Sequence, residues 1–309
     1  MTEHYLDASE TQPYWDAGIE PRLVVQPGDT VVMECAEPCG QVNSDWDAER
    51  ITQLDFSKIH ALTGSIYVDG AEPGDALAIE ILNLEHHGWG WTGHIPNFGL
   101  LAEEFDHGFI HHWRLEGERC HLGEAGVVLP YEPFPGCLGV APRPEEGRLN
   151  TIPPRQNGGN IDCRDATIGS TVWLPVNVPG ALFAGGDCHG NQGQGEVCGT
   201  AIEAPMTMTA RLGLVKAANL PEMRLQRLAP RVNRYERGSY ITSAHGPDLF
   251  ENAKNAVRYM IDHLGREYGL KPSLAYCLCS TAVDLKIAEI VDAPNWLVTA
   301  SLPLAIFGN

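Results

Sequence analysis

The sequence predicts a protein of the α+β class that is mainly β. We expect β-sandwich-like or barrel-like N-terminal and central portions and a smaller C-terminal portion that contains helices. Apolar and polar residues alternate over 206–214, which is typical of a half-buried strand. The turn sequence Pro-Gly-Asp occurs at 27–29 and again at 73–75, each time between segments rich in β-branched residues. Clear helical periodicity begins only after residue 246.

The first half of the chain is expected to form short strands. Residues 1–20 are predicted to be a loose arm with one anchor, Trp15. Each Pro-Gly-Asp turn separates two strands, in the units 23–35 and 64–84, which favours a sandwich or barrel. The stretch 45–58 between the units is expected to be helical or irregular. Short strands follow over 114–140, and a long irregular segment covers 142–159. We place a soft boundary here, between a mainly β part (1–150) and a site-bearing β part with two helices (151–309).

The second half contains both the predicted site and the predicted helices. Residues 171–178 are expected to form a strand, 179–180 a turn, and 181–184 the start of a second strand, together a hairpin. Strand structure resumes from Glu196. A helix is predicted from Pro247 to Gly265 and a second helix from Ser273, an N-cap candidate. A last strand is expected around 296–301.

Charge and cysteine content narrow the function classes. The net charge of −19 argues against nucleic acid or an anionic membrane as partner, whereas a small neutral substrate is compatible with it. The polar N-terminus has no signal-peptide pattern, and the longest apolar run, 296–307, is too short to span a bilayer. The nine cysteines contain no C-x-x-C pair, so we expect reduced thiols and a cytoplasmic location.

The glycine-rich segment 185–203, GGDCHGNQGQGEVCGTAIE, is the candidate site. Asp187 and His189 are two residues apart, so on a strand both side chains point to one face and Cys188 points to the other. Glu196 and Glu203 follow across the glycines. A second pair with the same spacing, Asn160 and Asp162, lies upstream beside Gly158 and Gly159. Imidazole and carboxylate groups are ligands of divalent metals, so the two pairs predict one metal site; the alternative is a set of solvated loop residues.

An aromatic segment, 88–101, is a candidate pocket wall. Tryptophan alternates with glycine at 88–93, and Trp91 and His94 are predicted to contact a small substrate. The alternative is a surface loop packed by its own aromatic rings.

These motifs resemble the acetamidase/formamidase family, metal-associated hydrolases of short amides. The segment GGNIDCRDATIGSTVWLPVNVPGALFAGGDCHGNQGQGEVCGTAIEAPM carries the resemblance, and further matching segments lie in the same order at 27–35, 60–82, 88–101, 136–142 and 273–296. The chain departs from the family pattern at Gln194, where an acidic residue is usual, at His94, and over 104–113.

The resemblance implies cleavage of the C–N bond in short linear amides such as formamide or acetamide. Our hypothesis is that Asp162, Asp187 and His189 hold a divalent metal that activates water. Zinc is favoured by ligand type, and calcium or manganese is also compatible. Glu196 is the predicted general base and Glu203 is predicted to hold His189. Asn160 or Gln192 would orient the amide.

Two other functions fit the same residues. A metal-free amidase with Cys188 or Cys137 as nucleophile is one, although adjacent strand residues face opposite sides, which argues against Cys188 with His189 as its base. A small-ligand binding protein, or an inactive metal-stabilised scaffold, is the other. A homo-oligomer, with a dimer favoured, is also expected.

Overall fold

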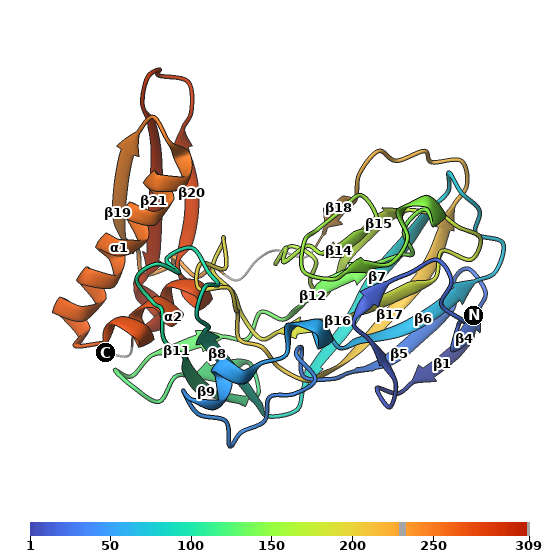
Figure 1. Ribbon diagram of the computed structural model, residues 1–309, viewed down its shortest axis with the longest axis horizontal. Helices are drawn as coiled ribbons and strands as arrows, with labels where there is room; N and C mark the ends of the chain where they lie inside the picture. Colours follow the sequence, from blue (N-terminus) through green and yellow to red (C-terminus); the bar gives the residue numbers. More distant parts are fainter. Residues whose placement is uncertain (229–232, 308–309) are drawn as a thin grey trace.

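The computed structural model describes residues 1–228 and 233–307 and confirms a mainly β protein with a small helical C-terminal part. Figure 1 shows the large β part on the right and the part with both helices on the left. Two six-stranded sheets form the large part as a sandwich, and the main hydrophobic core draws side chains from both. The first sheet has the order β1 (Glu3–Leu6), β5 (Thr30–Cys35), β17 (Met206–Val215), β7 (Ala76–His86), β15 (Ser170–Pro175), β18 (Arg224–Arg227).

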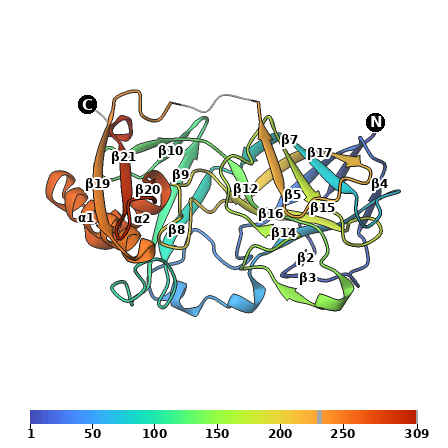
Figure 2. The same cartoon turned by 90° about the horizontal axis from the view of Figure 1, so that it is seen from above.

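The remaining strands form the second sheet of the sandwich and three smaller sheets, one of which, β8 to β11, lies between the sandwich and the C-terminal part (Figure 2). Both six-stranded sheets contain strands from before and after residue 150. The second sheet has the order β14 (Gly158–Asn160), β12 (Phe134–Gly139), β16 (Phe183–His189), β6 (Leu62–Val68), β2 (Thr11–Gln12), and β4 (Leu23–Val25) also pairs with β6. The four-stranded sheet has the order β11 (Val128–Pro130), β10 (Arg119–His121), β9 (Phe109–Glu116), β8 (Trp89–His94). A two-stranded sheet pairs β13 (Leu149–Asn150) with β3 (Tyr14–Trp15). The three-stranded sheet has the order β19 (Ser239–Gly246), β21 (Trp296–Pro303), β20 (Asp284–Glu289).

Both Pro-Gly-Asp turns connect strands of different sheets. β4 pairs with β6 in the second sheet, whereas β5, after the turn, lies in the first; β6 and β7 are divided in the same way. The turn aspartates accept main-chain hydrogen bonds, Asp29 from Gln26 (3.1 Å) and Asp75 from Glu72 (2.9 Å). The sequence therefore locates the turns, and each turn carries the chain across the sandwich.

The hairpin predicted over 171–184 is wrong for the same reason. β15 pairs with β7 and β18 in the first sheet, whereas β16 pairs with β12 and β6 in the second. Ala181 and Leu182 have φ values of 60° and 56°, which turn the chain from one sheet to the other instead of back along β15. A turn signal marks the end of a strand but does not say which strand it pairs with.

The N-terminal arm is more ordered than predicted. β1 pairs in parallel with β5, and Asp29 accepts a hydrogen bond from the Thr2 amide at 2.7 Å and contacts the His4 ring at 3.0 Å. Trp15 is buried, as expected. The irregular stretch 45–58 is also confirmed, with 3₁₀ turns η1 (Arg50–Gln53) and η2 (Phe56–Lys58).

The two C-terminal helices are confirmed with shifted ends. Helix α1 (Leu249–Tyr268) continues through Gly265 and ends at Gly269, which has the left-handed conformation of a C-cap. Its N-cap is Asp248, one residue after the predicted start. Helix α2 (Pro272–Ala282) starts one residue before Ser273, because Pro272 suits a first helical turn. Among the described residues, no helix combines the length and apolar character needed to cross a bilayer.

Candidate active site

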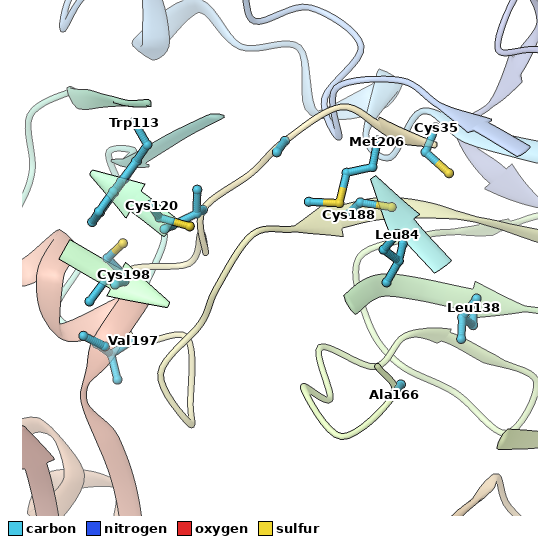
Figure 3. Packing of buried hydrophobic residues seen from close by; sticks show 14 of the residues in the cluster. Cys35, Leu84, Trp113, Cys120, Leu138, Ala166, Cys188, Val197, Cys198 and Met206 are labelled. Atoms are coloured by element: carbon cyan, nitrogen blue, oxygen red, sulfur yellow. The ribbon is translucent and has the colours of Figure 1, made fainter. Parts of the chain in front are cut away.

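Asp187 and His189 lie at the end of β16 and project to the same side, as predicted. The Asp187 Oδ1 atom is 3.5 Å from His189 Nε2. Cys188 lies on the opposite side, inside the main core beside Cys35 and Met206 (Figure 3). The i, i+2 spacing therefore places the two polar side chains together and keeps the intervening thiol away from them.

The upstream pair reaches the same place because its strand lies two positions away in the sheet. In β12, Cys137 pairs with Asn160 on one side and with Gly186 on the other. The carbonyl of Gly136 accepts hydrogen bonds from the amides of residues 161 (2.9 Å) and 162 (3.2 Å), which turns Asp162 toward β16. Both predicted pairs thus approach one site.

The glycine-rich loop brings the two glutamates to this site. The structure places 196–205 in turns and isolated bridges, so the expected strand from Glu196 is wrong and strand structure resumes only at Met206. One carboxylate oxygen of Glu196 approaches ligand atoms of Asp162 and His189, all within 4.8 Å of one another. The other glutamate, Glu203, contacts His189 Nε2 at 3.3 Å through Oε2 and accepts a hydrogen bond from the amide of residue 201 through Oε1.

Three acidic residues of the site have backbone conformations that side chains disfavour. Asp162, Asp187 and Glu196 have φ values of 42°, 55° and 44°. Such conformations cost on the order of 1–3 kcal/mol each and persist only where the surroundings impose them, which occurs most often at functional sites. The chain therefore accepts local strain to aim these carboxylates at one point.

Gln192 sets the orientation of the His189 ring. Its side-chain amide donates to the carbonyl of Asp162 (3.0 Å), so its Oε1 atom faces His189 Nδ1 at 2.9 Å. The oxygen can only accept, so Nδ1 carries the proton of the neutral ring and the Nε2 lone pair faces Asp187 and Glu203. Glu203, expected to hold His189, contacts its Nε2 atom, and Gln192, expected at the substrate, contacts its Nδ1 atom.

The site gathers four carboxyl groups around one imidazole. His189 forms one group with Asp162 and Glu196 and another with Asp187 and Glu203; Asp187 and Glu203 are buried, and Asp162 and Glu196 are partly buried. Burial and the neighbouring carboxylates raise the pKa of Glu196 and Asp162, and although burial opposes the imidazolium, Glu203 and Asp187 raise the pKa of His189. The Asp162 Oδ1 atom is buried without a hydrogen-bond partner. Carboxylate oxygens and one free imidazole nitrogen form a donor set that suits a divalent metal.

A cavity of about 220 Å³ opens onto this cluster. Trp91 and Asn160 line it, as predicted. Gln192 does not, and His94 lies outside it: both ring nitrogens of His94 are buried without partners among Phe105, Phe109 and Tyr276. This geometry does not support the expected contact between His94 and substrate.

Sequence reasoning missed His60 and the hydrogen bond from Trp91 to Glu37. His60 lines the cavity, and its Nε2 atom lies 3.7 Å from Asp187 Oδ2. The only sequence signal was its position at the start of a segment that carries the family resemblance, 60–82. Trp91 donates from its indole nitrogen to buried Glu37 at 2.9 Å, and burial raises the pKa of Glu37 to about 7. No sequence pattern connects these two residues.

The cysteine alternative loses support from this geometry. Cys137 is fully buried, and burial with nearby Asp187 and Asp162 raises its thiol pKa. The pKa of Cys188 is also raised, by its contact with Cys35 and by burial. A thiol that stays protonated is a weak nucleophile.

The C-terminal helix α2 holds the loop that carries Glu196. The Ser280 carbonyl accepts from the amide of residue 193 (2.8 Å), and its hydroxyl accepts from the amide of residue 198 (3.1 Å) and donates to the carbonyl of residue 200 (2.6 Å). Tyr276 donates to the carbonyl of residue 197 (2.5 Å). The helix therefore packs in the main core and also positions the site.

A buried ion network supports the same loop from the other side. Asp284 accepts two hydrogen bonds from Arg164, at 2.6 and 3.0 Å, and one from the amide of Gln194 at 3.1 Å. Arg164 and Arg234 each donate to the carbonyl of Gln192, at 3.1 and 3.3 Å. The residue that orients His189 is therefore itself held by two guanidinium groups.

Fold and cavity together describe an enzyme site for a small molecule, with ligands for a cation, a candidate base and an apolar wall. Comparison with known proteins agrees. The model of the Acetamidase/Formamidase family matches residues 3–148 and 144–309. The chain belongs to this family, and the predicted enzyme class, hydrolases of amide C–N bonds, is confirmed.

Individual relatives match over most of the chain. A formamidase from Methylophilus methylotrophus is 27% identical, covering 95% of this chain and 88% of the relative. A gamma lactamase from Delftia acidovorans has a TM-score of 0.92 and 25% identity, covering 99% of this chain and 94% of that chain. An acetamidase from Bacillus halodurans has a TM-score of 0.68 and 30% identity, covering 97% of each chain.

Proposed function

We propose that this protein is a metal-dependent amidohydrolase that cleaves the C–N bond of small neutral amides to a carboxylate and ammonia. The observation that carries the metal dependence is a pair of donor groups that share His189, one with Asp162 and Glu196 and the other with Asp187 and Glu203, together with the unpartnered Asp162 Oδ1 atom. Of these residues, Asp162, Asp187, His189 and Glu203 would hold the ion, zinc being the first candidate and calcium or manganese the next. Bound there, a divalent cation lowers the pKa of water and polarises the amide carbonyl.

The chain's own residues would perform the remaining steps. Glu196 takes a proton from the attacking water as the oxygen bonds to the carbonyl carbon, and returns it to the nitrogen as the C–N bond breaks. Burial raises the pKa of Glu196, which favours a carboxyl group that can both accept and return a proton. Asn160, on the cavity wall, can hold the amide group, and Gln192 keeps His189 oriented.

A cyclic amide is the second candidate substrate. The backbone follows the Delftia acidovorans gamma lactamase with a TM-score of 0.92, against 0.68 for the Bacillus halodurans acetamidase. Ring opening of a lactam uses the same attack on an amide carbonyl, with the amine retained in the product.

The nine cysteines are free thiols, which supports a reducing cytoplasm as the location. The predicted dimer stays a prediction, to be tested by measuring the molecular mass of the protein in solution.

The test is product release by the purified protein before and after chelation, with metal content measured by mass spectrometry on the same sample. Ammonia is measured for linear amides and the ring-opened amino acid for γ-butyrolactam. We expect turnover that falls on chelation and returns with zinc. Turnover that persists in metal-free protein contradicts the metal dependence, and bound metal without turnover of any amide contradicts the hydrolase proposal.

A further inference from the structure

The cavity above the carboxylates has two chemically different sides. The polar side is the cluster of carboxyl and imidazole groups, with Asn160 and Thr200 beside it. The other side is apolar, and its side chains come from the segment between β5 and β6, from β8 and the loop after it, and from the segment before β14. These side chains are Leu54, Phe56, Ile59, Trp91, Ile95, Phe98 and Ile152.

This apolar wall belongs to a hydrophobic cluster separate from the main core. Val42, Trp46 and Ile51 form its buried backing, and Leu54, Ile59 and other wall residues complete it. A wall backed by packed side chains keeps its shape, so it provides a fixed surface for an apolar group rather than a collapsible one. Formamide has no apolar group that could use this surface.

Two aromatic rings in contact with each other line the cavity. Phe56 and Phe98 meet edge to face with ring centroids 5.7 Å apart. A Cβ atom at Gly199 would lie 2.5 Å from two ring atoms of Phe98, so the ring rests against the bare glycine backbone. The contact with Gly199 therefore holds the Phe98 ring in place at the cavity wall.

The apolar side of the cavity has no charged partner for a negatively charged group. None of its described lining residues is Lys or Arg, and four of them are acidic. A second carboxylate on a substrate would be desolvated against an apolar wall and repelled by the acidic side, which costs several kcal/mol. The lining thus selects against amides that also carry a carboxylate.

We propose that the substrates of this enzyme are neutral amides with an apolar acyl chain or ring larger than that of acetamide, and that Phe98 sets the upper size limit. The proposal rests on the proposed amide hydrolysis. Each methylene that enters a hydrophobic pocket raises kcat/KM by roughly 10-fold or more. The apolar wall would therefore be used in the transition state, where it favours longer acyl groups.

The experiment measures kcat/KM for formamide, acetamide, propionamide, butyramide and cyclohexanecarboxamide, and for succinamate, in which a carboxylate replaces the methyl group of butyramide. We expect a rise of about 10-fold per methylene from acetamide to butyramide, and succinamate at least about 100-fold below butyramide. Formamide or acetamide as the best substrate, or succinamate equal to butyramide, overturns the proposal while amide hydrolysis stands. Ring opening of γ-butyrolactam without ammonia release from any of these amides also overturns the proposal while amide hydrolysis stands, and turnover of neither the linear amides nor the lactam overturns amide hydrolysis itself, and with it the proposal.

Phe98→Ala tests the size limit. We expect kcat/KM to fall about 10-fold for butyramide, to rise for cyclohexanecarboxamide, and to change less than about threefold for formamide. Phe250→Ala, which removes an exposed ring on α1, is the matched control and should leave the preference unchanged. Equal losses for formamide and butyramide show a purely structural role and overturn the assignment of Phe98. If Phe98→Ala does not fold, Phe98→Leu provides the same comparison.

Discussion

Gly136→Ala is the sharpest test of the cation site. A Cβ atom at Gly136 would lie 2.6 Å from Asp187 Oδ2, 2.7 Å from Asp162 Oδ1 and 2.8 Å from His189 Cε1. To reach an ordinary contact of about 3.5 Å, each carboxylate must move by roughly 0.9 Å. Metal–ligand distances tolerate only about 0.2 Å, so the displaced carboxylates and imidazole no longer converge on one ion.

We expect the variant to lose at least about 100-fold in metal affinity and at least about 100-fold in kcat/KM, because a misplacement of about 1 Å at a reacting centre has that effect. Metal content is read by mass spectrometry and affinity by competition with a coloured chelator. Thermal unfolding separates loss of metal from loss of fold. Zinc at about 100 times its Kd should stabilise the wild type by about 2.7 kcal/mol and leave Gly136→Ala unchanged.

Gly213→Ala is the matched control. Gly213 lies in β17, and its nearest neighbours, the Cβ and O atoms of Ala78, are 3.6 and 3.8 Å from the position of an added methyl group. This variant should keep both metal and activity. A Gly136→Ala protein that binds metal like the wild type and retains its activity would refute the location of the ion between Asp162, Asp187 and His189.

Three further variants test the base, the His189 support and the buried ion network. Glu196→Gln should lower kcat by about 100-fold to 10,000-fold at unchanged metal content, because a general base contributes that much; full activity would remove Glu196 from this role. Gln192→Leu should weaken metal binding about 10-fold to 100-fold by releasing His189 Nδ1, whereas Gln194→Leu, whose side chain faces away from the site, should not; equal effects would contradict the support role. Asp284→Asn should lower the free energy of unfolding at pH 7 by about 3–5 kcal/mol, because it removes the Asp284 carboxylate charge from the buried guanidinium groups of Arg164 and Arg234. Although burial opposes the carboxylate, Arg164 lowers the pKa of Asp284, so its stabilisation is present above the unfolded pKa of about 3.9 and is lost as pH falls through the lower folded pKa. The urea midpoints of Asp284→Asn and wild type should therefore converge only below about pH 4, and convergence near pH 6 would be inconsistent with this sign.

The parts of the site that follow from local geometry were predictable. Side chains two apart on a strand share a face in any sheet, so the spacing of Asp187 and His189 was sufficient to place them together. The same spacing of Asn160 and Asp162, with glycines beside both pairs, extended this to Asp162, and the family resemblance supplied the enzyme class. Contacts that depend on loop conformation were not predictable. The contact between Gln192 and His189 follows from the turns at 190–203, and glycines permit such turns without specifying them.

Pairing between strands was the other limit. The Pro-Gly-Asp turns lie between strands as predicted, and the strand before Pro179-Gly180 ends three residues before the predicted position, at Pro175. A turn that crosses a sandwich has the same sequence signal as a turn that closes a hairpin. His60 was missed for a related reason. It precedes β6, next to β16 in the second sheet, and its approach to Asp187 exists only once that pairing is known.

The hydrogen bonds by which α2 and Asp284 hold the glycine-rich loop in place have a consequence for protein synthesis. All four acidic residues of the site have left the ribosome before Tyr276, Ser280 and Asp284, which fix the loop, are translated. At about 5–20 residues per second, the 81 residues from Glu203 to Asp284 take roughly 4 to 16 s. During that interval the nascent chain carries the carboxylates without the contacts that hold the loop in place. Enzymatic competence therefore arises only after α2 and Asp284 have been translated, and a chain terminated before α2 would contain every proposed metal ligand and still lack an organised site.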